Sequence, residues 1–201
     1  VTDHFATASL CGPNSKKILN KIIPELNLSD DNFPHMSFKE VLIDKIKCRV
    51  MRISFTGELS YEINAPASYG EAVWQKCIEA GKEFNITPYG TETMHLLRAE
   101  KGFIIVGQDT DGTMTPIDLQ MDWIVSKKKY DFIGKRSLYR SDTMREDRKQ
   151  LVGLVTDDPS IVLEEGAQIV SELNQNPIEM LGHITSSLSL IHISEPTRQS
   201  K

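Results

Sequence analysis

The sequence lacks the features that mark several large classes of protein. It has no apolar run of about 18 residues, which a membrane-spanning helix requires, and no charged-then-apolar leader at its start. Its formal net charge is −5, and its longest basic run is three lysines, Lys127–Lys129. This charge disfavours a nucleic-acid or anionic-membrane surface. We therefore expect a cytoplasmic protein whose ligands are small molecules or other proteins.

Residues with metal or redox chemistry are also scarce. The three cysteines, Cys11, Cys48 and Cys77, form no C-x-x-C pair, and an odd, scattered set predicts reduced thiols rather than a disulfide framework. The five histidines show no metal-ligand spacing, so no metal site is expected. Dinucleotide, P-loop, G-x-S-x-G and H-E-x-x-H motifs are absent. The sequence therefore predicts no nucleotide site.

The first part of the chain has the patterns of an α+β domain. Apolar–polar alternation predicts strands over residues 6–10, 38–43, 47–55 and 59–64. Helical spacing and stop signals predict helices over residues 14–23, 68–80 and 92–101. Ser68 and Glu71 have the spacing of a capping box, and Thr91 is placed to cap the last of these helices.

The second part has shorter predicted elements. We expect a buried strand over 103–106, a long loop over 108–118 and a brief helix over 131–139. A charged stretch follows, and then strands over 151–156, 168–172 and 180–186, which are typical of the start of a small β-barrel. The predicted division is a domain over 1–140 and an incomplete β-barrel domain over 141–187.

Glu62 stands out as a carboxylate on the polar side of a predicted strand. A three-residue loop, Thr56–Glu58, would place all apolar residues of the two flanking strands on one face. The pairs would then be Phe55 with Leu59, Ile53 with Tyr61, Met51 with Ile63 and Arg52 with Glu62. One explanation of Glu62 is thus an exposed ion pair with Arg52, worth about 0–1 kcal/mol.

A second explanation is ligand binding. Glu62, Arg98 and Asp109 are polar residues on or next to predicted ordered elements. A carboxylate suits a ligand with two adjacent N–H donors, and an arginine fork suits a carboxylate. This combination is typical of a site for a heterocycle with an acidic tail.

Three runs carry a resemblance to a known family: 53-ISFTGELSYEINAP-66, 87-TPYGTETMHLLRAEKGFIIVGQDTDGTMTP-116 and 132-FIGKRSL-138. They resemble the folate-binding aminomethyltransferases, that is, the glycine-cleavage T-protein and its relatives. The resemblance covers residues 1–187 and implies the fold of that family, here a folate-binding domain without its amino-terminal part.

The resemblance implies a tetrahydrofolate site. The family motif T-G-E-x-x-x-E falls on Thr56–Glu62, where Glu62 would accept paired hydrogen bonds from the pterin. Arg98 would lie near the glutamyl tail, and Phe55 would stack where the family usually has tyrosine. Tyr89 and Asp109 are weaker candidates for folate binding. The catalytic aspartate of the family precedes the region matched here, so no catalytic residue is assigned and Asp3 is not given that role.

Within the family, the sequence of residues 89–95 and 98–102 most resembles the carboxyl-terminal region of sarcosine oxidase alpha subunits. This likeness implies a hetero-oligomer whose FAD, FMN and NAD bind outside this chain, with tetrahydrofolate capturing the methyl-derived carbon as 5,10-methylenetetrahydrofolate. Alternatives are a stand-alone aminomethyltransferase, the folate domain of dimethylglycine dehydrogenase, a non-catalytic folate-binding protein of the same fold, and a structural domain in which Glu62 pairs with Arg52.

The last residues of the chain have a different origin. Residues 188-LSLIHISEPTR-198 match the translation of a transposase sequencing adapter, so we interpret 188–201 as an artefact that belongs to neither domain. The alternative is a native strand, which the composition also allows. Sequencing the locus from independent DNA is expected to show codons that differ from these after Ser187. A natural gene that continues through them would contradict the interpretation.

Overall fold

The computed structural model describes residues 2–158, 160–174 and 176–188. They form two compact units, divided between Phe103 and Ile104. The proposed artefact lies outside the described residues except for Leu188. None of the described helices is long and apolar enough to cross a membrane. The predicted domain boundary at residue 140 stays a prediction.

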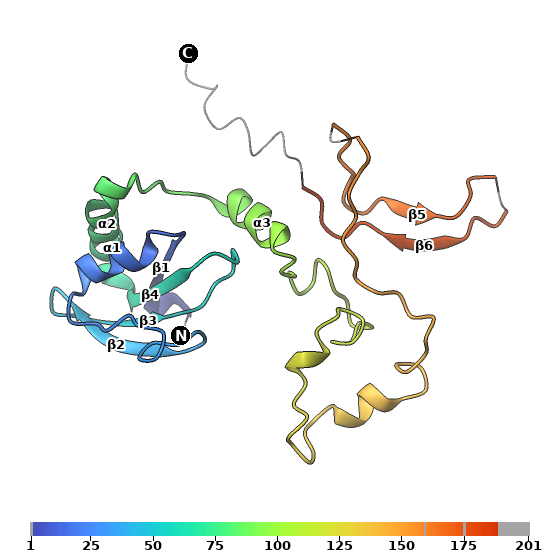
Figure 1. Cartoon of the computed structure of the whole chain (residues 1–201), viewed down its shortest axis with the longest axis horizontal. Coiled ribbons are helices and arrows are strands. Elements are labelled where there is room, and N and C mark those ends of the chain that lie inside the picture. The colour runs from blue at the N-terminus through green and yellow to red at the C-terminus, as the bar shows by residue number, and fades with distance from the viewer. Residues whose placement is uncertain (1, 159, 175, 189–201) are drawn as a thin grey trace. The chain divides into compact units, whose positions relative to one another are not determined.

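The first unit combines one antiparallel sheet with helices (Figure 1). Its strands, in the spatial order β1-β4-β3-β2, are β1 (Phe5–Cys11), β4 (Ser60–Pro66), β3 (Ile46–Met51) and β2 (Phe38–Ile43). Its α-helices are α1 (Ser15–Ile22), α2 (Gly70–Gly81) and α3 (Thr91–Glu100). Short 3₁₀ helices cover Thr2–His4, Ala67–Tyr69 and Lys82–Phe84. Within the described residues, β1 and β2 form the two edges of this sheet.

The core lies between one face of the sheet and helices α1 and α2. Alternate residues of β4, namely Tyr61, Ile63 and Ala65, are fully buried and point to this face. The helices contribute the apolar residues of their inner stripes. The buried helix residues are Ile18, Leu19 and Ile22 of α1 and Val73 and Cys77 of α2. The alternation of β4 therefore leaves its even-numbered side chains on the opposite face.

The predicted register of β3 and β4 is wrong by one residue. Met51 pairs with Glu62 rather than with Ile63, and β3 ends at Met51 instead of continuing to Phe55. The prediction assumed a tight hairpin, whereas residues 52–59 form a longer irregular connection. Arg52 is held elsewhere, because its Nη1 donates to Asp30 Oδ1 at 2.8 Å and to the carbonyl of Phe33 at 2.7 Å. The predicted Arg52–Glu62 pair is therefore absent.

The helices begin at different residues from those predicted. Helix α2 starts at Gly70 after a 3₁₀ turn, and no side-chain cap bond from Ser68 forms. A Cβ on Gly70 would lie 2.5 Å from Ala6 Cβ, so the start of this helix packs closely on β1 and a side chain at position 70 would clash there. Thr91 is the first residue of α3 rather than its cap, because Gly90 takes the N-cap position. Helical spacing places Trp74 beside the buried residues Val73 and Cys77, but Trp74 is 39% exposed.

The second unit has less regular structure than predicted. Its strands β5 (Gln168–Val170) and β6 (Met180–His183) form a two-stranded antiparallel sheet, and no closed sheet occurs in the described part of the chain. The predicted strands over 103–106 and 151–156 do not form, and Val106 is 82% exposed. In the region of the helix predicted over 131–139, a short 3₁₀ helix forms over Lys135–Tyr139, and another 3₁₀ helix, Asp122–Ile124, lies before it. Short apolar runs alone carry no information about a pairing partner.

An ion pair holds the irregular segments of this unit together. Asp118 is 1% exposed and accepts hydrogen bonds from Arg148 Nε at 2.8 Å and Nη2 at 2.6 Å. The backbone N–H and hydroxyl of Thr115 also donate to it. The guanidinium of Arg148 lowers the pKa of Asp118 to about 2. The loop around residue 115 is thereby fixed to a segment some thirty positions later.

Replacing Asp118 by Asn is expected to destabilise the second unit by about 3 kcal/mol at pH 7, because it leaves a largely buried guanidinium without its charge partner. The lowered pKa means that the ion pair stabilises the fold above the ordinary carboxyl pKa of about 4 and that this contribution is lost as the pH falls toward 2. The loss measured by chemical denaturation should therefore shrink over that range. Asp142→Asn is the control, because Asp142 lies 3.7 Å from Arg148 Nη1 and is 65% exposed. A loss as large for Asp142→Asn would contradict the assignment.

Candidate functional site

The face of the sheet opposite helices α1 and α2 carries a polar patch at β1 and β4. Ser9 pairs with Glu62 and Cys11 pairs with Ser60, so these four side chains share one face. Ser9 Oγ and Ser60 Oγ are 3.4 Å apart and share a hydrogen bond. We call these four residues and Tyr89 the polar patch.

Glu62 lies at the centre of the polar patch. Its side chain is half-buried, and burial raises the pKa of its carboxyl group above the ordinary value. Within the described residues, its carboxylate takes part in no hydrogen bond or ion pair. A carboxylate that is partly desolvated and has no partner in the chain is suited to accept hydrogen bonds from a ligand.

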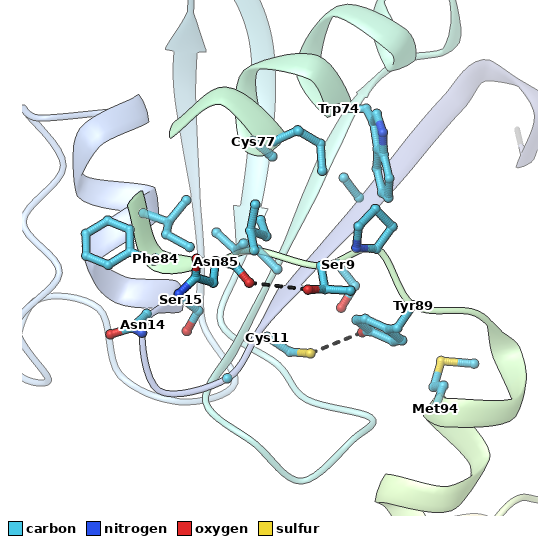
Figure 2. Close-up of a pocket in the computed structure, with 18 of the residues that line it drawn as sticks. Ser9, Cys11, Asn14, Ser15, Trp74, Cys77, Phe84, Asn85, Tyr89 and Met94 are labelled. Atoms are coloured by element: carbon cyan, nitrogen blue, oxygen red, sulfur yellow. Dashed lines mark hydrogen bonds between the residues drawn. The ribbon is translucent and has the colours of Figure 1, made fainter. Parts of the chain in front are cut away.

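Tyr89, the fifth residue of the polar patch, comes from the segment between α2 and α3. The thiol of Cys11 donates a hydrogen bond to Tyr89 Oη over 3.2 Å, and Figure 2 shows the ring next to the end of β1. Burial raises the pKa of the Tyr89 hydroxyl, and the hydrogen bond with Cys11 and the nearby charge of Glu62 add to this effect. The structure thus brings the predicted residues Glu62 and Tyr89 together.

The turn that precedes Glu62 is held at its base. The carbonyl of Leu59 accepts hydrogen bonds from Gly12 N at 2.9 Å and from Ser15 Oγ at 3.0 Å. Thr56 is buried, and its hydroxyl accepts a weak hydrogen bond from Glu58 N. Phe55 lies in this turn and is 38% exposed. In a regular strand, the alternation of side chains would place Phe55 and Glu62 on opposite faces of the sheet. Phe55 lies in a turn, so this alternation does not fix the direction of its ring.

Arg98 is buried at the end of α3, where it is 3% exposed. Its Nη1 donates to the carbonyl of Phe103 at 3.1 Å, while Phe103 N donates back to the Arg98 carbonyl at 2.8 Å. Gly102, with φ +71, closes the helix in a Schellman arrangement. The backbone at the end of α3 therefore helps to orient the Arg98 guanidinium.

Asp109 lies in the second unit, where hydrogen bonds within the chain hold its carboxylate. It is 4% exposed and accepts hydrogen bonds from Ile105 N at 2.8 Å and from Ser186 Oγ at 2.6 Å. The neighbouring Gln108 donates to the Thr185 carbonyl and to Ser186 Oγ. Both residues thus join the loop after residue 104 to the segment around 185.

A cavity of about 460 Å³ opens beside β1, and part of the polar patch lines it (Figure 2). Ser9, Cys11 and Tyr89 line it together with residues of α1 and α2. Its lining does not include Glu62, so the carboxylate lies outside this cavity. Of the residues of the polar patch, sequence reasoning missed Ser9, Cys11 and Ser60. Their alternation on the two strands was visible, but their pairing with Glu62 required the register.

Comparison with known proteins shows the family of this chain. Residues 1–129 match the family model described as the GCVT N-terminal domain. The chain belongs to the GCVT family. The polar patch and the preceding turn both fall inside the matched region, as does the whole sheet of the first unit.

Curated relatives of this GCVT-family chain carry two names. The sarcosine oxidase subunit alpha of Corynebacterium sp. (strain P-1) is 52% identical over 93% of the chain, and that of Rhizobium meliloti is 39% identical over 96%. The aminomethyltransferase of Halothermothrix orenii is 36% identical over 76% of the chain. The chain spans about a fifth of the length of these alpha subunits and 42% of that aminomethyltransferase.

Replacing Glu62 by Gln is expected to stabilise the ligand-free chain at pH 7, by about 1–3 °C in melting temperature. The raised pKa means that the folded state holds the Glu62 proton more tightly than the unfolded state does. Stability therefore falls as the pH rises through the interval between the ordinary and the raised pKa. Glutamine avoids that loss, so the gain should vanish at pH 4 and below.

Glu40→Gln is the control for this measurement. Glu40 lies on β2, where hydrogen bonding to Lys47 lowers the pKa of its carboxyl group. The Glu40→Gln variant should therefore show no gain in melting temperature at pH 7. An equal gain for both variants, or a Glu62→Gln gain that persists below pH 4, would show that burial of the Glu62 charge is not the cause.

Proposed function

We propose that this chain is the tetrahydrofolate-binding part of a one-carbon transfer enzyme. The observation that carries the proposal is the carboxylate of Glu62, half-buried on a polar strand face and without a partner among the described residues. The amino-pyrimidinone edge of a pterin presents two adjacent N–H donors, and a carboxylate in such a position can accept both. Membership of the GCVT family supports the same ligand.

Three other residues have proposed roles in this site. Tyr89, beside Glu62, offers an aromatic ring and a hydroxyl to the pterin. Phe55 in the exposed turn supplies a second aromatic surface. Arg98 would attract the glutamyl carboxylates, with its guanidinium already oriented by the end of α3. No nucleophile–base pair is required of these residues, because binding and orientation of the reactants supply most of the rate enhancement in such a transfer.

The proposed reaction is that of sarcosine oxidase. In the complete enzyme a flavin outside this chain would supply the two-electron oxidation of the N-methyl group of sarcosine, and the folate held by this chain would take up the resulting one-carbon unit, leaving glycine. The residues of this chain bind and orient the folate. The other subunits and the FAD, FMN and NAD would lie outside this chain, and Asp109 would act as a structural residue.

A stand-alone aminomethyltransferase is the second candidate. The match to the aminomethyltransferase of Halothermothrix orenii favours it, because that protein shares 36% identity with the chain. The identity to the sarcosine oxidase alpha subunits, 52% in one of them, favours the first candidate. Both candidates require the same folate site.

Glu62→Ala in the complete protein that contains this chain is expected to weaken tetrahydrofolate binding at least about a hundredfold, because a charge-assisted pair of hydrogen bonds is lost. Isothermal titration calorimetry measures the change in Kd. Glu40→Ala is the control, since Glu40 is an exposed glutamate on the far edge strand of the same sheet. Unchanged affinity of Glu62→Ala would disprove the assignment of Glu62 to the pterin.

A further inference from the structure

The tip of the turn before Glu62 packs against the end of α3. Gly57 has φ +79, and a Cβ built on it would lie 2.6 Å from Lys101 Cβ and still closer to Lys101 Cγ. Such separations are too short for two carbon atoms, so a side chain at position 57 would displace Lys101. The alkyl stem of Lys101 therefore lies directly on the backbone of the turn.

This contact completes the anchoring of the turn. The base of the turn is already fixed, because the Leu59 carbonyl accepts bonds from Gly12 and Ser15. Lys101 fixes the tip. The backbone that leads into β4 is thus held between β1 and α3. Glu62, two residues after the start of β4, is held with it.

The same contact joins the two ends of the proposed ligand site. Lys101 follows Arg98 by three residues at the end of α3. Lys101 N donates to Leu97 O and Gly102 N donates to Ala99 O, so Lys101 is fixed at the point where the helix closes. Any movement of the turn away from Lys101 would therefore change the separation between Glu62 and Arg98.

We propose that Lys101 is a positioning residue of the folate site. Its stem, packed on Gly57, sets the distance between the carboxylate that receives the pterin edge and the guanidinium that receives the acidic tail. The ammonium group has no part in this role. The inference rests on the proposed function, because it assumes a ligand that reaches both ends.

A double-mutant cycle in the complete protein tests the contact. Gly57→Ala, Lys101→Gly and the double variant are titrated with tetrahydrofolate and with a tetrahydropterin that has no glutamyl tail. Gly57→Ala is expected to raise the Kd for tetrahydrofolate about tenfold, since the added methyl forces Lys101 away. In the Lys101→Gly background the same substitution should raise the Kd less, because the clash with Lys101 has been removed and only the backbone strain of alanine at φ +79 remains.

The tail-less ligand separates positioning from general damage to the fold. It contacts only the Glu62 end, so its Kd should change less than about threefold in every variant. Lys101→Met is the conservative control, because methionine keeps an alkyl stem without the charge. It should bind both ligands as the wild type does, and melting temperatures confirm that each variant is folded.

Each outcome has a defined meaning. Failure of the wild-type protein to bind tetrahydrofolate would overturn the proposed function and this inference with it. Wild-type binding combined with additive effects of Gly57→Ala and Lys101→Gly would overturn the inference alone. Equal losses for the two ligands, or a Lys101→Met variant as weak as Lys101→Gly, would also overturn it.

Discussion

The pairing of β4 with β1 on one side and β3 on the other is the constraint on which the first unit depends. Because β4 is an interior strand, its backbone groups are used in both ladders and its register cannot shift without loss of both. The register places Tyr61, Ile63 and Ala65 under the helices. Glu62 and its neighbours on β1 are then held on the opposite face, in one orientation.

This arrangement has an energetic cost at Glu62. Burial raises the pKa of its carboxyl group, which means that the charged form is less favourable in the fold than in water. The core of fully buried apolar residues on the other face of the same strand offsets that cost. A carboxylate maintained in this way is typical of a binding residue, since no partner in the described part of the chain explains its position.

The two units are stabilised by different means. In the first unit, a continuous apolar core lies between a sheet and two helices. In the second, side chains join irregular segments: Arg148 binds Asp118, and Asp109 and Gln108 bind the segment around residue 185. Such contacts link residues far apart in the sequence, which is why apolar periodicity predicted few of the elements in this part of the chain. The predicted β-barrel accordingly corresponds only to the two-stranded sheet β5–β6.

By itself, the sequence determined the elements of the first unit and its family. Residues 38–43 alternate clearly enough to give β2 its observed bounds, and the T-G-E-x-x-x-E motif indicated Glu62. Only the tertiary structure decided the register of β3 and β4, which separates Arg52 from Glu62, and the contact of Lys101 with Gly57. The physical reason is that periodicity reports which face a residue occupies, whereas a partner across the sheet or along a turn is chosen by packing between distant segments.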